Sequence, residues 1–358
     1  MIPPVNLRPA TRDDVSRVHR WLHDRAVYDS WFGLDPLGRP VHIGYSPPEV
    51  LQQCADDWQA FLNVNHHKVL SVHALEEGHI GEAQLHFVDG ETRSAEVFVL
   101  IGRPSLWRRG YGTAATVKLL DYCFYTYGLE EIFAAVPEAN ASAIALFQRI
   151  GFTIEGTQSA SRYRKQPCLL LALREPAFQQ RRSWLVEPVS RLGEAAVGQV
   201  LARPACMQMD ILRGLSREQR AAVVALSSPM KVPAGWEMGK AQHPGDCLYF
   251  ILEGLAELTA SSSLGEVTVR IAHEGEALPL ASLLGQGRLI TSITAMTEME
   301  VLAVPRSRFK DLCAKRPDIG NLVNANMAET LAGRYKAALA HFASMTQRVA
   351  TADLWANI

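Results

Sequence analysis

Apolar residues recur every three or four positions in two stretches near the N-terminus, at about 13–24 and 48–63. This helical spacing then gives way to three strand-like runs at 68–75, 80–88 and 94–101. Glycine-containing turn signals follow the first two runs, and the second is an Asp-Gly pair. The pattern therefore predicts two helices followed by strands that are joined by hairpins.

After the third run, the order of strand, turn and helix occurs twice. Gly110 and Gly112 lie in the first turn, and an apolar stripe follows it up to Gly128. A strand is predicted at 132–136, and Asn140 is a natural N-cap for a helix at 141–150. We therefore expect alternating strands and helices to continue to about residue 177.

The turn before the first of these helices has the composition of an anion site. Gly110 and Gly112 allow backbone N–H groups to converge, and the helix N-terminus adds a partial positive charge. Arg108 and Arg109 add full positive charges, so the turn suits a pyrophosphate. On this fragment alone, an ordinary tight connection between a strand and a helix is an equal alternative.

The second half of the chain has a different pattern. A polar run at 179–183 indicates a linker, and residues 189–201 have the pattern of a short helix. Short strands separated by Gly and Pro occupy about 229–304, with helices on either side, which predicts a β-barrel or jelly roll. The expected division is a first domain at 1–177, a linker at 178–206, a barrel domain at 207–345 and a tail at 346–358.

Composition excludes several classes of protein. The 358 residues include 36 Lys and Arg against 37 Asp and Glu, so the basic field that nucleic acid or anionic membrane requires is missing. No apolar run approaches the roughly 20 residues of a membrane helix, and the N-terminus does not resemble a secretory signal. The six cysteines are scattered, so we expect free thiols, no metal site and a cytoplasmic location.

Three short strings, taken in order, resemble the GNAT acetyltransferase superfamily: Trp107 to Thr113, Asn140 to Ser142, and Ile150 to Phe152. The resemblance covers about residues 7–175 and is closest in style to the branch of the ribosomal-protein N-terminal acetyltransferases. It implies an α/β (α+β) GNAT fold, with a mixed central sheet and flanking helices, and acetyl-CoA as co-substrate. Many members have Gln or Arg in place of Trp107, but Trp is a frequent variant in this branch.

The resemblance also implies where acetyl-CoA binds. The turn from Arg108 to Thr113 is expected to hold the pyrophosphate, and a splayed strand around Leu100 to Gly102 is expected to lend backbone groups to the pantetheine arm. The residues expected to contact acetyl-CoA are Leu100, Ile101, Gly102, Trp107, Arg108, Arg109, Gly110, Tyr111, Gly112, Thr113, Asn140 and Phe147.

Acetyl transfer to an amine requires a proton acceptor. A lysine-type amine has a pKa near roughly 10.4, so about one molecule in a thousand is neutral at pH 7. Glu96 lies on the strand before the turn, where histone-type GNAT enzymes carry their catalytic glutamate, and it is our candidate. Alternatively, Glu96 is an ordinary exposed carboxylate without a catalytic role. One of four histidines would then be the base. These histidines are His66, His67, His73 and His86.

One position departs from the GNAT pattern. Many members carry a tyrosine four residues before the Gly-Phe pair, where it protonates the departing thiolate, whereas this chain has Phe147. A phenylalanine gives no proton. Either the thiolate leaves to water, or Tyr111 or Tyr163 substitutes, or the domain is slow or inactive.

The second half resembles the cyclic-nucleotide-binding domain over about residues 207–342, most specifically at Leu248 to Gly254, and Leu212 to Leu226 is expected to be the helix before the barrel. In that family a Glu holds the ribose and an Arg holds the phosphate. Here Leu280 and Leu289 occupy those positions, and Arg288 is displaced by one residue, toward the opposite face of a strand. We therefore expect no cAMP or cGMP binding of the usual kind. A barrel used for docking or oligomerisation, or one that binds a less polar ligand, is the alternative.

Together these observations predict an N-acetyltransferase that acts on a primary amine, either a protein lysine or an N-terminus, with a regulatory or oligomerisation barrel. A small-molecule amine as acceptor, and a catalytically weak CoA-binding scaffold or sensor, are the alternatives. The pairing of modules resembles the bacterial cAMP-regulated protein lysine acetyltransferases, but their order is reversed here. Residues 318–358 contain few basic side chains, so the DNA-binding helices of a transcription factor are not expected.

Overall fold

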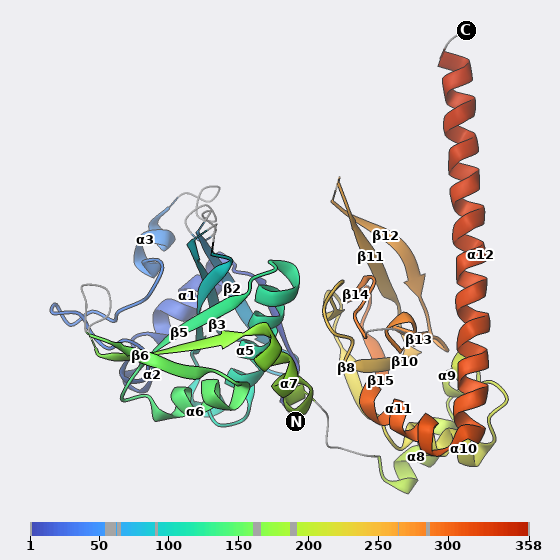
Figure 1. Cartoon of the computed structure of the whole chain (residues 1–358), viewed down its shortest axis with the longest axis horizontal. Helices are drawn as coiled ribbons and strands as arrows, with labels where there is room; N and C mark the ends of the chain where they lie inside the picture. Colours follow the sequence, from blue (N-terminus) through green and yellow to red (C-terminus); the bar gives the residue numbers. More distant parts are fainter. Residues whose placement is uncertain are drawn as a thin grey trace. The chain divides into compact units, whose positions relative to one another are not determined.

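The computed structural model describes residues 2–53, 62, 66–89, 92–159, 166–186, 192–263, 265–283 and 287–356. The chain divides into two compact units, Met1–Pro188 and Val189–Ile358 (Figure 1). Each unit has a hydrophobic core of its own.

The N-terminal unit is built on one seven-stranded sheet, in the order β1-β2-β3-β4-β5-β7-β6. Every neighbouring pair is antiparallel except β4 and β5, which are parallel. This is the mixed sheet that the sequence predicts. The strands are β1 Val5–Pro9, β2 His67–Ala74, β3 Gly78–Asp89, β4 Ser94–Ile101, β5 Glu131–Pro137, β6 Thr153–Gln158 and β7 Cys168–Arg174.

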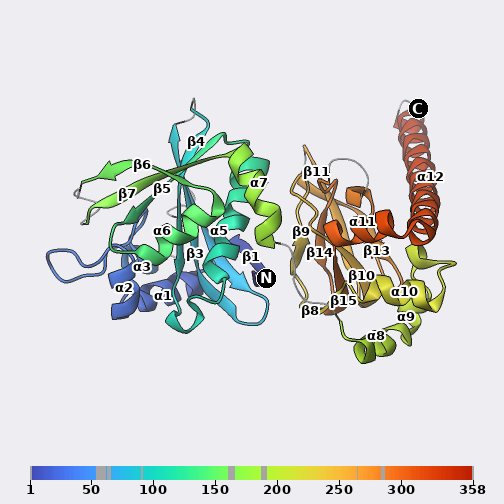
Figure 2. The same cartoon turned by 60° about the horizontal axis from the view of Figure 1, so that its bottom comes forward.

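Helices cover both faces of this sheet, as Figure 2 shows. On β4, Val97 faces the core formed with α5, α6 and α7, whereas Phe98 faces the core formed with α1 and α2. The alternation of side chains along the strand thus feeds two separate apolar layers. The helices are α1 Arg12–Trp21, α2 Arg25–Ser30, α3 Pro47–Gln52, α5 Tyr111–Asp121, α6 Ala141–Ile150 and α7 Glu175–Val186. A short η1 turn lies at Pro104–Leu106, and a π-helical turn, η2 Tyr122–Thr126, follows α5.

Strands β4 and β5 part soon after they meet. Their pairing covers Ser94 with Glu131, Ala95 with Ile132 and Glu96 with Phe133, and it ends there. Beyond this point β4 continues beside β3 and β5 continues beside β7. The backbones of the two strands therefore face an opening instead of each other.

The expected linker at 178–206 is largely helical. Helix α7 belongs to the N-terminal unit, because Phe178 is fully buried in its core and Arg182 pairs with Asp121 on α5. The two guanidinium–carboxylate distances are 2.6 and 2.7 Å, and both side chains are buried. A buried bidentate pair of this kind fixes α7 against α5. The polar sequence pattern at 179–183 gives no sign of this packing. Two more helices follow, α8 Glu194–Leu201 and α9 Pro204–Met207.

The C-terminal unit contains two antiparallel four-stranded sheets, in the orders β13-β10-β15-β8 and β12-β11-β14-β9. This agrees with the predicted jelly roll. The strands are β8 Ser228–Val232, β9 Glu237–Gly239, β10 Cys247–Glu253, β11 Ala256–Ser262, β12 Gly265–Ala272, β13 Ala277–Leu278, β14 Ser292–Ala295 and β15 Met299–Pro305. The flanking helices are η3 Asp210–Leu212, α10 Arg217–Val224, η4 Ala281–Leu283, α11 Arg306–Lys315 and α12 Pro317–Ala356.

Two expectations for the helices need correction. The helix predicted before the barrel is shorter, because η3 and α10 are separated by a turn at Gly214, where φ is +77°. The expected tail at 346–358 continues α12, which spans 40 residues. Of the helix predicted at 48–63, the structure describes 47–52 and residue 62 as helical. Most of the remainder, and Gly90 of the predicted hairpin turn, lie outside the described residues.

Candidate active site

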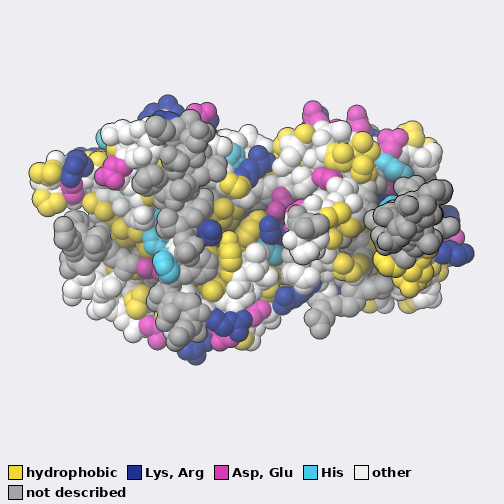
Figure 3. All heavy atoms as spheres, turned by 90° about the horizontal axis from the view of Figure 1, so that it is seen from above, with side chains coloured by type: hydrophobic (Ala, Val, Ile, Leu, Met, Phe, Trp, Pro, Cys, Tyr) yellow, Lys and Arg dark blue, Asp and Glu magenta, His cyan; other side chains and the backbone are white. Residues whose placement is uncertain are grey.

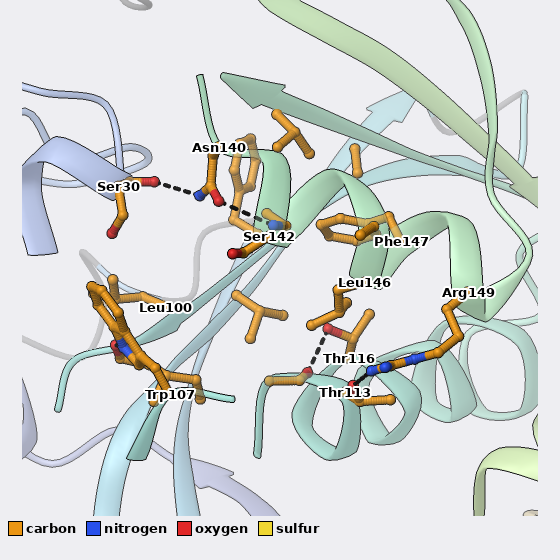
Figure 4. Close-up of a pocket in the computed structure, with 18 of the residues that line it drawn as sticks. Ser30, Leu100, Trp107, Thr113, Thr116, Asn140, Ser142, Leu146, Phe147 and Arg149 are labelled. Carbon is orange, nitrogen blue, oxygen red and sulfur yellow. Dashed lines mark hydrogen bonds between the residues drawn. The ribbon is translucent and has the colours of Figure 1, made fainter. Parts of the chain in front are cut away.

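A cavity of about 920 Å³ lies where β4 and β5 part (Figure 4). Residues 97–101 of β4 and 134–137 of β5 form two of its walls, and the glycine turn and α6 complete it. The parting predicted around Leu100 to Gly102 thus begins earlier on the strand, directly after Glu96.

One end of the cavity is cationic. Gly110 is the N-cap of α5 and has a φ of +88°, a left-handed conformation that glycine adopts without strain. Arg108 and Arg109 line the cavity beside it. Because the first N–H groups of a helix have no partner within the helix, those of α5 are available to an anion at this end.

A third arginine lies at the same end and was not predicted from the sequence. Arg149, on the last turn of α6, donates a hydrogen bond of 2.5 Å to Thr113 Oγ1 on the first turn of α5. Figure 4 shows its side chain reaching across the cavity toward Thr113. Within 141–150 Arg149 has the pattern of a solvent-facing polar residue, so only the packing of α6 against α5 reveals it.

Apolar side chains line the middle of the cavity. Trp107 donates its indole N–H to the Ile101 carbonyl oxygen at 2.8 Å, which holds the ring against the end of β4. Phe147 is 7% exposed and contacts Phe152 edge-on, with ring centroids 4.9 Å apart. Leu100 lies on the wall near Trp107 (Figure 4). This section suits an uncharged arm.

Asn140 joins two elements at the other end. Its Oδ1 accepts from the Ala143 backbone N–H at 3.0 Å, which is the predicted N-cap of α6. Its Nδ2 donates to the Ser30 carbonyl oxygen at 2.7 Å (Figure 4). The second bond holds the end of α2 beside α6, so Trp31 and Phe32 line the cavity as well. No motif in that segment pointed to them.

Most of the residues expected to bind acetyl-CoA lie around this cavity, and two do not. Gly102 gives its N–H to the Ile80 carbonyl oxygen at 3.0 Å, and a Cβ there would lie 2.1 Å from the Trp21 ring. Its role is therefore to make room for Trp21. Tyr111 packs beside the core, and burial, followed by the charge of Glu77, raises its pKa. The other proposed acid, Tyr163, lies outside the described residues. The residues that line the cavity are Leu100, Ile101, Trp107, Arg108, Arg109, Gly110, Gly112, Thr113, Asn140 and Phe147.

Glu96 is half-buried at the point where β4 and β5 still pair. It lies opposite His86 on β3, and the cavity lining begins at the next residue, Val97. His86 and His67 both contact Gln84 Oε1, at 2.9 and 3.1 Å. His73 lies 3.8 Å from Asp14, and His66 is exposed.

A buried polar cluster that the sequence did not suggest lies on the same face of the sheet. At its centre is Glu82 on β3, with a side chain that is 3% exposed. Glu82 accepts from Tyr45 Oη and from Gln84 Nε2, each at 2.5 Å, and its Oε1 lies 3.0 Å from His42 Nε2. Burial alone would raise the pKa of Glu82, but its contact with His42 and the hydrogen bonds from Tyr45 and Gln84 lower it overall. Glu82 is therefore ionised.

In the barrel, Leu280 and Leu289 are 2% and 4% exposed. A Cβ added to Gly239 would lie 2.6 Å from Leu289, and one added to Gly245 would lie 3.0 Å from it, so Leu289 packs closely against both glycines. Arg288 is exposed, whereas its neighbours Gly287 and Leu289 are buried. Leu280 and Leu289 are thus both buried inside the barrel.

Membrane-spanning helices and metal sites are both absent from the described part of the chain. None of its helices has the length and apolar character needed to cross a membrane. Likewise, no group of three or more His, Cys, Asp or Glu residues there has the arrangement of a metal site.

Comparison with known proteins agrees with these two folds. The acetyltransferase (GNAT) domain family matches residues 5–153, and the cyclic nucleotide-binding domain family matches residues 230–316. Human alpha/beta-tubulin-N-acetyltransferase 9 is 28% identical over 200 residues, which cover 53% of this chain and 88% of that protein. Spermidine N(1)-acetyltransferase of Escherichia coli K12 is 25% identical over 152 residues, which cover 42% of this chain and 74% of that protein.

Among solved structures, spermidine N-acetyltransferase from Vibrio cholerae in complex with CoA and spermine is 22% identical, with a TM-score of 0.41. The match covers 49% of this chain and 98% of that one. The two family matches identify a GNAT acetyltransferase domain at residues 5–153 and a cyclic nucleotide-binding domain at residues 230–316.

Proposed function

We propose that this chain transfers the acetyl group of acetyl-CoA to a primary amine, and that the amine belongs to a protein, as a lysine side chain or an N-terminus. The observation that carries the proposal is the cavity between β4 and β5, with Arg108, Arg109 and Arg149 at one end and an apolar middle section. A pyrophosphate fits the first part and a pantetheine arm fits the second. The acetyl group then lies toward Trp31 and Phe98.

Acetyl transfer requires removal of a proton from the acceptor before its nitrogen can attack. The ammonium of the acceptor gives one proton to a base, and the neutral nitrogen attacks the thioester carbonyl carbon. A C–N bond forms, the C–S bond breaks, and the second amine proton leaves with the thiolate or through water. Phe147 lines the cavity as an apolar wall and gives no proton to this last step. Glu96 is the proton acceptor that the sequence suggests.

The relatives support an amine acceptor of either size. One is named for tubulin and another for spermidine. A small polyamine is therefore the alternative to a protein amine, and a CoA-binding scaffold without turnover is the alternative to both. The free cysteines among the described residues and the balanced charge support a cytoplasmic location as part of the proposal.

Calorimetry of the full chain with acetyl-CoA, followed by thiol release with a panel of peptides and polyamines, tests the proposal. Saturable binding and turnover that favours peptides support it. Turnover with polyamines alone assigns a small-molecule acceptor, and binding without turnover favours the scaffold. Arg149→Gln should weaken acetyl-CoA binding by roughly tenfold, because a charge-assisted contact is lost. Arg25→Gln is the matched control, because the Arg25 side chain on α2 is 85% exposed and lies outside the cavity.

For the C-terminal domain, we propose association between two copies of the chain through α12. The first half of this helix packs on the domain through Ile319, Val323 and Met327. Farther along, Tyr335, Leu339 and Phe342 are 67%, 48% and 69% exposed, at the spacing of one helix face. Figure 3 shows that hydrophobic side chains are present on the surface of the C-terminal unit. A second copy of the same stripe would cover them, as in a coiled coil.

A further inference from the structure

The polar cluster around Glu82 lies beside the end of the cavity where the acetyl group is expected. Trp31 and Phe98 line that end. The Trp31 ring is 6.2 Å from the His42 ring, and the Phe98 ring is 4.8 Å from the His86 ring, measured between centroids. The cluster therefore forms the next layer behind the cavity wall.

One ring nitrogen of His42, Nε2, faces Glu82, and the other, Nδ1, does not contact it. Its side chain is 2% exposed, and Nε2 lies 3.0 Å from Glu82 Oε1 and 3.3 Å from Gln84 Nε2. Because Glu82 is ionised, a bare Nε2 lone pair at 3.0 Å from it would be repelled, so Nε2 carries the proton. In neutral His42, Nδ1 is then an acceptor.

This acceptor nitrogen has no hydrogen-bond partner among the residues that the structure describes, and neither has the indole N–H of Trp31. Buried polar groups without a partner are costly, and they usually mark a water molecule or a ligand group. The two rings that carry these atoms are neighbours, with centroids 6.2 Å apart. One water that accepts from Trp31 Nε1 and donates to His42 Nδ1 would satisfy both.

The loop that carries His42 is fixed in place over Glu82. Gly44 has a φ of +89°, and a Cβ there would lie 2.5 Å from Gln84 Oε1 and 2.6 Å from His67 Nε2. Only a glycine lets the backbone lie so close to these side chains. Tyr45 follows and donates to Glu82 Oε2, and burial raises its pKa, so it remains protonated.

We infer that His42, oriented by Glu82, takes the proton from the acceptor amine through one water, in place of Glu96. The inference rests on the proposed acetyl transfer and names its base. The proton passes from the ammonium to the water while the water gives a proton to His42 Nδ1. The imidazolium is stabilised by Glu82, and it then releases the proton to solvent. Glu82 and Tyr45 are positioning residues in this scheme.

Other ionisable groups also lie around His42. Glu82 and Tyr45 contact it directly or through the shared carboxylate, and Gln84 connects it to two further histidines. Burial lowers the pKa of His67, so this neighbour stays neutral. Glu82 is thus the charged group in direct contact with His42 among the described residues. The ionisable neighbours of His42 are thus Glu82 and Tyr45, with His67 and His86 reached through Gln84.

The pH dependence of kcat/KM for wild type, His42→Gln and Glu82→Gln tests the inference, with acetyl-CoA affinity measured by calorimetry on each. His42→Gln should lower kcat roughly a hundredfold and leave acetyl-CoA affinity unchanged. Its residual rate should rise with pH until the amine itself is neutral. The Glu82→Gln variant has no carboxylate to stabilise the imidazolium of His42. The acidic limb of its kcat/KM profile should therefore move to lower pH.

His23→Gln is the matched control, because His23 is an exposed histidine at the end of α1, away from the cavity. A wild-type profile for His42→Gln, or a Glu82→Gln variant with reduced rate and an unmoved acidic limb, overturns the inference. If His42→Gln does not fold, the inference is tested by the acidic limb of the kcat/KM profile of Glu82→Gln alone. A wild-type chain that acetylates no amine contradicts the proposed function instead, so the two failures are distinguishable.

Discussion

The two units differ in the room they leave where their families hold a ligand. Between β4 and β5 the N-terminal unit keeps about 920 Å³, with charge at one end and apolar walls in the middle. In the barrel, Leu280 and Leu289, which the sequence predicts at the positions of the family's Glu and Arg, are buried, and Leu289 packs against Gly239 and Gly245. A family match therefore describes both folds equally well, and a few interior side chains separate a binding site from a filled core.

The position of positive charge sharpens this contrast. Arg108, Arg109 and Arg149 come from two elements and line one cavity. Arg288 of the barrel is one residue away from the interior position and is exposed. Along an extended chain, a shift of one residue reverses the side-chain direction, so a cation next to the right position in sequence lies on the wrong side in space.

The largest effect that the comparison predicts is on acetyl-CoA binding. In Gly110→Val, a β-branched residue meets a φ of +88°, so the turn should change shape and its N–H groups should move away from the anion. We expect a loss of affinity of roughly a hundredfold or more, measured by calorimetry. Gly235→Val introduces the same left-handed strain at a φ of +75° in the other unit, and it should leave affinity unchanged. Equal affinity in folded Gly110→Val would remove the turn from the site.

The next effect concerns association of chains. Phe342→Glu places a charge in the exposed stripe of α12, and the apparent dissociation constant of the dimer should rise by at least roughly tenfold. Sedimentation velocity over a range of concentrations measures this. Ala340→Glu is the control, because position 340 faces the other side of the helix from position 342. A monomeric wild type, or equal masses for the two variants, would contradict association through this helix.

Regular elements could be predicted well from the sequence, because they depend on local patterns. Strand β4 was predicted at 94–101 and is Ser94–Ile101, and Asn140 and Gly151 bound α6 as expected. Each of these follows from alternation, a cap or a glycine within ten residues. Helix α7 was missed because its apolar stripe is short, and it is fixed by the buried pair of Arg182 with Asp121, which lies 61 residues earlier.

The candidate site was predictable only where it follows one continuous turn. Residues 107–113 were found because glycines and arginines are adjacent there in sequence. Arg149, Trp31 and the group of His42, Tyr45 and Glu82 were not found, because each reaches the site from a separate element. A single sequence contains no signal for such meetings. For Glu96, the sequence suggested a role, and the structure places the residue one position before the cavity lining.

A smaller effect is expected at Glu96. If His42 is the proton acceptor, Glu96→Gln should lower turnover by less than about tenfold, and the pH–rate profile should keep its acidic limb. The reason is position, since Glu96 lies where β4 still pairs with β5, and the cavity begins at Val97. A hundredfold loss together with a shift toward alkaline pH would return the role of base to Glu96. Steady-state kinetics at saturating acetyl-CoA distinguishes the two.

The smallest effect, none at all, is predicted for cyclic nucleotides. A cyclic phosphate in the barrel would meet Leu280 and Leu289 without a cation, and burying an unpaired phosphate there is strongly unfavourable. Titration with cAMP or cGMP should give no saturable heat at micromolar concentrations, and acetyl transfer should have the same rate with and without them. Saturable cAMP binding that is lost in Arg288→Gln would show that Arg288 reaches a ligand. The barrel would then hold a ligand as well, and the contrast between the two units would disappear.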